Sequence, residues 1–115
     1  MNTLGKDGEA LAVSFCKKKG YRVLEKNYRT AFGEIDIIAR DGDVIVFIEV
    51  KTRTDDTFGY PFEAVDARKR EKIRKVALCF MKKFKQEVPA RFDVFSISIA
   101  GGEKQIEHIK DAFEV

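Results

Sequence analysis

Residues 33–51 read GEIDIIARDGDVIVFIEVK, two runs of strand-forming residues on either side of a polar turn. Asp41-Gly42 is a favoured pair for the central positions of a two-residue hairpin turn. We therefore predict an antiparallel hairpin with strands over residues 33–40 and 43–51. Residues 44–50 are apolar except for Glu49, so the second strand is predicted to be covered on both sides.

The register of this hairpin decides where its charged side chains point. With Arg40 paired to Asp43, Asp36 faces Phe47 and Glu34 faces Glu49, because partners on antiparallel strands lie directly opposite each other. Asp36, Glu49 and Lys51 then all point to the same side of the sheet. A three-residue turn would move Asp36 to the side opposite Glu49. The two-residue turn and the proposed site therefore require the same register.

Two carboxylates and an amine on one face suit metal-assisted hydrolysis of a phosphodiester. Asp36 and Glu49 are hard oxygen ligands, and Mg²⁺ usually takes one or two carboxylates together with waters and phosphate oxygens. Lys51 can orient the attacking water or stabilise charge on the phosphate. The alternative is a cross-strand salt bridge, because Glu-x-Lys arises often by chance. The apolar strand around Glu49 favours a site, since a buried charge is costly unless it pairs or binds metal.

Four more charged residues are candidates for this site, each with an alternative. Glu9 either leans toward the sheet and assists a metal through water, or is a first-turn glutamate favoured by the helix dipole. Glu34 either joins the carboxylates or pairs with Lys51 or Arg53. Arg29 and Arg53 either hold phosphate or neutralise carboxylates. Arg53 follows the Glu-Val-Lys motif directly, which favours a role in substrate contact.

The rest of the chain predicts an α/β fold. We expect a helix over 8–19, a strand over 21–29, a polar loop over 52–61, and a long amphipathic helix from an Asp66 N-cap to near Pro89. Residues 91–99 predict an interior strand, and residues 104–110 an edge strand with a helix as the alternative. A long helix between the hairpin and an interior strand is a crossover, so the sheet is predicted to be mixed and covered by helices.

Length and charge limit the possible functions. The 115 residues, 44% hydrophobic and 36% charged, suit a single domain over 1–115. The net charge is only +3, but residues 66–86 carry nine Lys or Arg against two acids. We predict that this basic helix, with Arg68, Lys69 and Lys72, contacts nucleic-acid phosphates; a solvated basic face is the alternative.

Several kinds of site are disfavoured. Cys16 and Cys79 have no metal-binding spacing and are interpreted as buried free thiols. His108 is the only histidine and has no partner that the sequence identifies, which disfavours a multi-histidine metal site. No glycine-rich phosphate loop is present. The apolar run Val44–Ile48 is too short for a membrane span, so we expect a cytoplasmic protein.

Glu9, Asp36 and Glu49-Val50-Lys51, in this order of elements, resemble the PD-(D/E)XK nuclease superfamily. That resemblance implies a three-layer, restriction-endonuclease-like fold with a central mixed sheet and the order αβββαββ. Ile35 stands in place of the proline that names the superfamily, and that proline supplies no ligand. More closely, the chain resembles the small bacterial YraN family, which is itself similar to archaeal Holliday-junction resolvases. The motifs that carry this resemblance are Gly8-Glu9, Asn27-Tyr28-Arg29, residues 33–39, residues 46–53 and Arg91-Phe92-Asp93.

The resemblance implies a metal-dependent endonuclease that acts on DNA, including branched or recombination intermediates. Asp36 and Glu49 would hold Mg²⁺ or Mn²⁺ together with the Val50 carbonyl, Lys51 would act on the water, and Glu9 would be accessory. Cleavage of junctions would further imply a homodimer with two sites. The alternative is a non-catalytic nucleic-acid-binding or protein-interaction domain on the same scaffold. The presence of the complete trio Asp36, Glu49 and Lys51 favours an enzyme.

Overall fold

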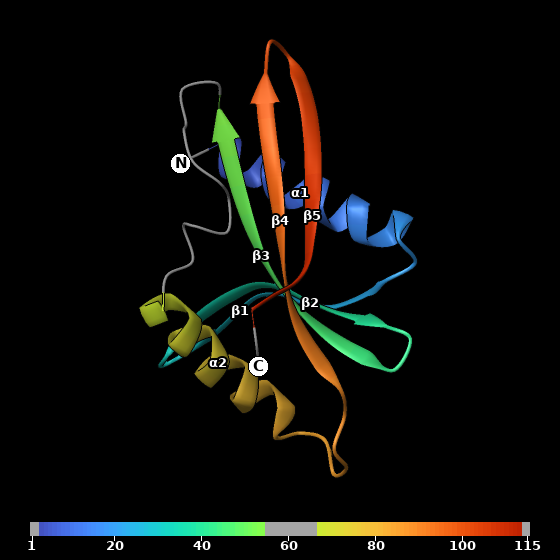
Figure 1. Cartoon of the computed structure of the whole chain (residues 1–115), viewed down its shortest axis with the longest axis vertical. Coiled ribbons are helices and arrows are strands. Elements are labelled where there is room, and N and C mark those ends of the chain that lie inside the picture. The colour runs from blue at the N-terminus through green and yellow to red at the C-terminus, as the bar shows by residue number, and fades with distance from the viewer. Residues whose placement is uncertain (1–2, 55–66, 114–115) are drawn as a thin grey trace.

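The computed structural model describes residues 3–54 and 67–113, with side chains described over 8–52, 67–99 and 101–113. Two helices and five strands follow one another in the predicted order αβββαββ (Figure 1). They are α1 (Thr3–Lys18), β1 (Arg22–Thr30), β2 (Gly33–Asp41), β3 (Val44–Thr54), α2 (Ala67–Met81), β4 (Ala90–Ala100) and β5 (Glu103–Phe113). The fold is α/β and is consistent with the restriction-endonuclease-like architecture expected from the sequence.

The five strands form one mixed sheet in the order β1-β2-β3-β4-β5. Neighbours are antiparallel except β3 and β4, which run parallel because the chain returns to β4 through α2. The crossover and the mixed sheet confirm the prediction. Residues 104–110 lie in the edge strand β5, so the helical alternative for that segment is wrong. The sheet is strongly twisted, with β1 and β2 crossing the direction of β3, β4 and β5 (Figure 1).

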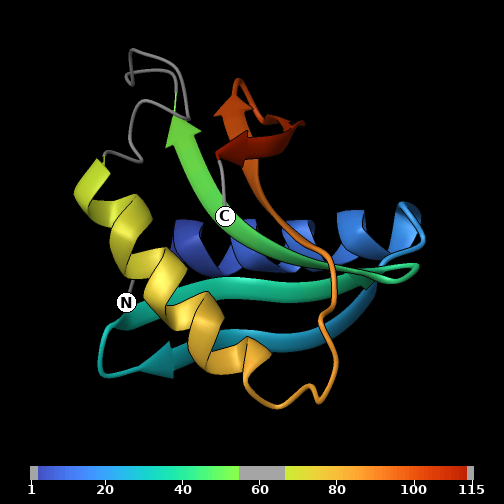
Figure 2. The same ribbon diagram turned by 60° about the horizontal axis from the view of Figure 1, so that its bottom comes forward.

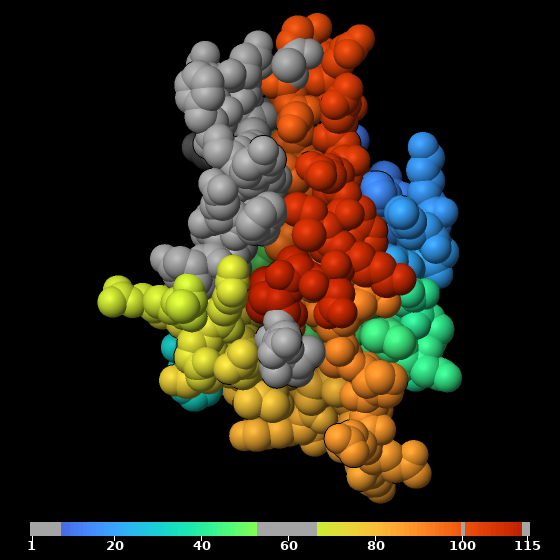
Figure 3. Space-filling view, viewed as in Figure 1, coloured from blue at the N-terminus to red at the C-terminus, as the bar shows by residue number. Residues whose placement is uncertain are grey.

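Each face of the sheet buries its own core under one helix (Figure 2). Under α2, Ile73 and Phe80 pack with Phe47 and Phe92 of the sheet. Under α1, a second cluster forms around Cys16 and includes side chains from β2, β3 and β4, among them Ile48 and Phe95. The strand β3 therefore has apolar side chains on both faces, as predicted. From the viewpoint of Figure 3, β5 and α2 make up much of the described surface and little of α1 is visible.

The β2–β3 hairpin has a register two residues away from the predicted one. Asp41 pairs with Val44 and Ile38 pairs with Phe47, so the turn residues are Gly42-Asp43 and Asp36 does not face Phe47. Gly42 has φ 59°, which suits the first central position of a type II′ turn. The paired residues end at Ile37 and Ile48, which directly adjoin Asp36 and Glu49 in the chain. The expected pairing of Glu34 with Glu49 is therefore wrong, although a shift of two residues leaves the paired residues 37–41 and 44–48 on their expected faces.

Both helices differ in length from the sequence prediction. The first helix begins at Thr3 rather than at residue 8. The second ends at Met81, well before Pro89. Beyond it the backbone makes hydrogen bonds of the 3₁₀ type between residues three apart: Phe84 N donates to Met81 O at 3.1 Å. The chain then turns so that Pro89 O accepts a hydrogen bond from Ile45 N at 2.9 Å and leads into β4. Residues 52–54, expected in a loop, extend β3; Asp66 and the rest of that loop lie outside the described residues.

A buried polar network joins β4 to its neighbours at the end of the sheet where β4 begins. Asp93 is fully buried and accepts hydrogen bonds from Arg91 Nε at 3.1 Å and from Asp111 N at 2.9 Å. His108 Nε2 lies 2.6 Å from Asp93 Oδ2, so the expectation that His108 has no partner is wrong. Arg91 also donates to Asp41 and Tyr21. Because β5 brings residue 108 back beside β4, only the tertiary structure reveals this pair.

The two cysteines are free, and their environments differ. Cys16 is completely buried, as predicted, while Cys79 is only partly buried. Burial, helped by the charge of Asp93, raises the pKa of Cys16 to about 11. This thiol is therefore uncharged near neutral pH and packs as a small apolar side chain. In the described ranges, neither helix combines the length and the apolar character that a membrane crossing requires.

Candidate active site

Asp36 sits at a break in the alternation of β2. Strict alternation would place Ile35 and Ile37 on the same face, yet Ile35 packs under α2 and Ile37 packs under α1. On β1, the residue between the two flanking pairs is Asn27, which has φ 51°. The break directs the Asp36 carboxylate toward β3, where its Oδ2 accepts a hydrogen bond from Val50 N at 2.8 Å. Asp36 is thereby fixed next to the end of the buried part of β3.

Glu49 is the most deeply buried carboxylate in this region, with 6% of the residue exposed. Its Oε1 accepts no hydrogen bond from any described group, and its Oε2 lies 3.5 Å from Lys69 Nζ. Burial and then the charge of Asp36 raise the pKa of Glu49 to about 7. Burial also raises the pKa of Asp36, against the opposing effect of the Val50 hydrogen bond. Two acids with raised pKa values therefore share one site, a pattern typical of functional positions.

Lys51 and Lys69 complete a carboxylate–lysine cluster with Asp36 and Glu49. Burial, and then contact with Lys69, lowers the pKa of Lys51. Burial also lowers the pKa of Lys69, but its contacts with Lys51 and Glu49 outweigh that effect and leave it raised. The structure thus brings together the predicted trio and adds one lysine from α2.

Lys69 was predicted to bind nucleic acid from an exposed helix face, but it points to the sheet. It lies four, seven and eleven residues before Ile73, Val76 and Phe80, which are the buried stripe of α2. Helical periodicity therefore places Lys69 on the extension of that stripe. This spacing was the available sequence signal. Arg68 and Lys72, the other two predicted phosphate contacts on this helix, are exposed.

Glu9 and Glu34 lie beside the cluster and are linked through Asn27. With its amide nitrogen facing the carboxylates, Asn27 donates to Glu34 Oε1 at 3.1 Å and to Glu9 Oε1 at 3.0 Å. The negative charges of Glu34 and Glu9 both contribute to the raised pKa of Asp36. Because α1 begins at Thr3, Glu9 is not in its first turn, and that alternative is wrong. Glu9 is thus held toward the sheet, as the functional alternative requires.

The two arginines predicted near the site are Arg29 of β1 and Arg53 of β3. Arg29 Nη2 lies 2.9 Å from Glu34 Oε2 and the arginine side chain is 77% exposed. Glu34 therefore pairs with Arg29 and not with Lys51, and Arg29 neutralises a carboxylate while its outer surface faces solvent. The backbone of Arg53 belongs to β3, but its side chain lies outside the described residues.

Gly8 sets the approach of α1 to this site. A β-carbon on Gly8 would overlap Oγ1 of Thr52 and lie 3.6 Å from Thr52 Cβ. Only glycine therefore allows α1 to pack this closely against β3. Glu9 follows directly in the chain, so this close packing is what carries its carboxylate toward β2.

The carboxylate pair fits a hard divalent ion. Asp36 and Glu49 supply oxygen donors, and the unpartnered Glu49 Oε1 is a buried acceptor of the kind that a cation satisfies. Within residues 3–54 and 67–113, no group of three or more Asp, Glu, His or Cys side chains is arranged to hold a metal. An ion here would thus rely on two carboxylates, with backbone, water or phosphate oxygens completing its shell, which is the usual pattern for Mg²⁺.

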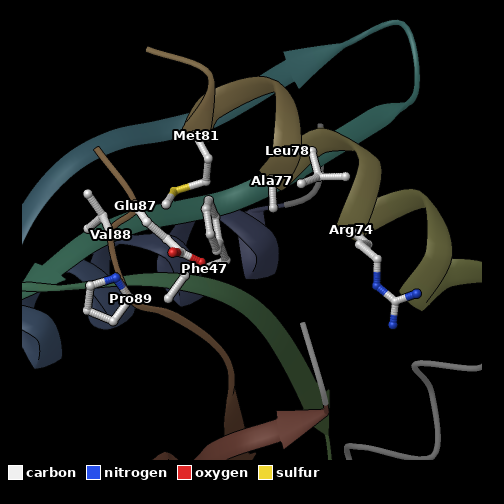
Figure 4. A pocket seen from close by; sticks show the side chains of 9 residues that line it. Phe47, Arg74, Ala77, Leu78, Met81, Glu87, Val88 and Pro89 are labelled. Atoms are coloured by element: carbon white, nitrogen blue, oxygen red, sulfur yellow. The ribbon is translucent and has the colours of Figure 1, made fainter. Parts of the chain in front are cut away.

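A separate hollow of about 600 Å³ lies between α2 and the segment that leads into β4 (Figure 4). Arg74 and Glu87 are its only charged lining residues among those described. None of the carboxylate–lysine cluster lines it, so it is not the candidate active site. The other residues that line it are Phe47, Ala77, Leu78, Met81, Val88, Pro89 and Ala90.

Comparison with known proteins places this chain in a family of similar chains. Residues 8–97 match the model of the uncharacterised protein family UPF0102. A UPF0102 protein of Thermodesulfovibrio yellowstonii is 53% identical over 96% of this chain and 95% of its own length. One from Geobacter metallireducens is 50% identical over 98% and 93%, and one from Clostridioides difficile is 47% identical over 95% of each. This chain therefore belongs to UPF0102, the YraN family that its motifs resemble.

Proposed function

We propose that this protein is a metal-dependent endonuclease of the PD-(D/E)XK type that hydrolyses phosphodiester bonds of DNA. Branched or recombination intermediates are the first substrates to test. The observation that supports this proposal most strongly is the position of Glu49, a buried carboxylate beside Asp36 with an unpartnered oxygen. Keeping such a group ionised costs folding free energy, and a bound cation would offset that cost.

Each residue of the site has a role in this proposal. Asp36 and Glu49, with the Val50 carbonyl, hold Mg²⁺ or Mn²⁺, which would supply Lewis-acid activation of a water and of the phosphate. The Lys51 amine orients the attacking water, and its lowered pKa favours the neutral amine, which is the form that can accept a proton. Glu9, fixed by Asn27, holds a further water at the edge of the site.

The surroundings of the site supply cations for the DNA backbone. Arg68 and Lys72 are exposed on α2, and the exposed guanidinium of Arg29 lies on the neighbouring hairpin. We propose that these three and Arg53 contact phosphates, which positions the substrate without reading its bases. Cleavage of a junction on two strands would require a homodimer. We place the protein in the cytoplasm, where DNA is the available substrate.

The test is a cleavage panel with purified protein. Single-stranded, duplex, flap and four-way-junction DNA, and structured RNA, are incubated with Mg²⁺, with Mn²⁺, or with EDTA. We expect metal-dependent cutting that falls about a hundredfold or more in Asp36→Asn and in Lys51→Ala, because each removes a ligand or a group that acts on the water. Lys82→Met removes an exposed cation beyond the end of α2 and is the matched control.

Two results would contradict the proposal in different ways. Cutting that persists in both site variants would place the active site elsewhere or expose a contaminating nuclease. Binding to nucleic acid without metal, and without cleavage of any substrate, would support a non-catalytic binding domain instead.

A further inference from the structure

We propose that Lys69 is the internal counter-ion of the Asp36–Glu49 pair, which a divalent metal displaces and which then binds a substrate phosphate. This inference rests on the proposed function and adds a regulatory step to the same site. It predicts that metal binding and nucleic-acid binding are coupled through one side chain.

The position of Lys69 on α2 is the first support. Lys69 Nζ lies 3.5 Å from Glu49 Oε2, and the lysine side chain is 39% exposed while that of Glu49 is 7% exposed. The ammonium thus lies at the border between the buried carboxylates and solvent. Lys69 is also the third residue of α2, next to the exposed Arg68, so its flexible stem connects the site with the basic surface.

Charge balance is the second support. Without a metal, the Lys69 ammonium lies 3.5 Å from Oε2 of the buried Glu49 and so balances part of the negative charge of the carboxylate pair. A divalent cation bound by the same two carboxylates would repel an ammonium held next to Glu49. The lysine therefore competes with the metal for Glu49, because two cations held against the same carboxylate repel each other.

The second partner of the displaced Lys69 side chain is a substrate phosphate. A phosphate that approaches the metal carries negative charge to the edge of the site, and α2 holds Lys69 at that edge. A ligand shifts a side chain between two positions only by interacting differently with each. Metal disfavours the position on Glu49, and phosphate favours the position outside. The two ligands should consequently bind cooperatively, and this cooperativity should depend on the charge at residue 69.

Metal affinity measured directly tests the first half of the inference. Isothermal titration calorimetry with MnCl₂ at pH 8.5 compares wild type with Lys69→Met, Lys69→Gln and Lys69→Arg. At this pH Glu49, with a pKa of about 7, is ionised, so protons do not compete strongly with the metal. We expect about tenfold tighter Mn²⁺ binding in the two neutral variants. Lys69→Arg should stay near wild type, and Lys82→Met should not differ from it.

Nucleic-acid affinity tests the second half. Fluorescence anisotropy of a labelled four-way junction is measured in EDTA and in CaCl₂, with gels to verify that the DNA stays intact. We expect Ca²⁺ to tighten binding in wild type, and the factor of tightening to be at least threefold smaller in Lys69→Met. Lys72→Met removes a neighbouring exposed cation, so it should weaken binding in both conditions equally.

Each outcome decides a different question. Tighter Mn²⁺ binding in the neutral variants, lost when Glu49→Gln is added, supports Lys69 as the counter-ion. Mn²⁺ binding that is unchanged or weaker in those variants overturns the role of Lys69 and leaves the proposed nuclease intact. A wild-type protein that binds no Mn²⁺ overturns both proposals. If Ca²⁺ tightens junction binding equally in wild type and Lys69→Met, the phosphate-binding half is wrong.

Discussion

Glu49 is a carboxylate that its position in β3 removes from solvent. It follows five residues of largely buried strand, and burial raises its pKa from the usual 4.5 to about 7. The folded state thus binds the Glu49 proton more tightly than the unfolded state does. By linkage, the stability contributed by this group is highest at low pH and falls as pH rises from about 4.5 to about 7. The cation site that we propose would explain why such a residue is present.

Glu49→Gln should therefore stabilise the metal-free protein. At pH 8 in EDTA we expect the variant to exceed wild type in free energy of unfolding, by up to about 3 kcal/mol, because it removes the cost of ionising a buried carboxylate. The advantage should shrink below pH 5, where wild-type Glu49 is protonated in the native state. Urea denaturation at several pH values measures this difference, with the exposed Glu103→Gln as control. A variant less stable than wild type at pH 8 would make Glu49 a structural residue.

At the residue scale, the sequence predicted the groups that belong to one hairpin and missed those that tertiary contacts supply. Asp36, Glu49 and Lys51 were recognised because strand alternation and one turn are enough to bring them together. His108 was not, since its partner Asp93 lies on another strand and the pair is buried on the α1 side. Lys69 had a signal in its helical spacing, but the surrounding Lys and Arg residues led to the prediction that it contacts nucleic-acid phosphates from an exposed face.

At the scale of elements, the Asp93 network links three strands, β2, β4 and β5. Asp93 lies in β4 and contacts His108 of β5, while Arg91 extends from β4 to Asp41 at the β2–β3 turn. That contact also explains the hairpin register. Turn propensity favoured Asp41-Gly42 at the centre of the turn, but in the structure Asp41 is a paired strand residue that binds Arg91. Local propensity was therefore overridden by a contact fifty residues away in the chain.

Asp93→Asn should weaken the whole sheet. The substitution leaves the Arg91 guanidinium, only 11% exposed, without its buried carboxylate, and we expect a loss of about 3 kcal/mol in the free energy of unfolding. Tyr21→Phe removes one hydrogen bond to the same guanidinium and should cost only about 1 kcal/mol. Urea denaturation at pH 7 compares the two. Equal losses would indicate that the network contributes through packing and not through the buried charge of Asp93.

At the scale of the whole molecule, the two faces of the sheet carry different groups of polar side chains. The α1 side carries the buried polar network around Asp93, while the carboxylate–lysine cluster lies farther along β3, near the start of α2. The sequence predicted this three-layer plan because its crossover helix and interior strands follow simple rules of pattern and connection. It predicted the end of α1 and the start of α2 to within one residue, but it missed the start of α1 and the end of α2. The end of α2 depends on a tertiary contact, the hydrogen bond from Ile45 N to Pro89 O.

The positive charge of the molecule is concentrated on α2, and its effect on DNA binding can be measured. The net charge is only +3, so a general attraction to DNA is weak, and binding should depend on the cations near the site. Each phosphate contact on duplex DNA adds about 0.9 to the slope of log affinity against log salt. Replacing Arg68 and Lys72 together by Ala should then reduce the slope by about 2, measured by fluorescence anisotropy with Ca²⁺.

The same loss of charge elsewhere should behave differently. Lys104 and Lys110 are exposed on the edge strand β5, and their double replacement by Ala changes the net charge by the same amount. If α2 forms the nucleic-acid surface, this variant keeps the wild-type slope, because its cations make no phosphate contact. Equal reductions in both variants would mean that DNA is attracted by total charge and has no fixed position over Asp36 and Glu49. A positioned substrate therefore requires the two double variants to differ.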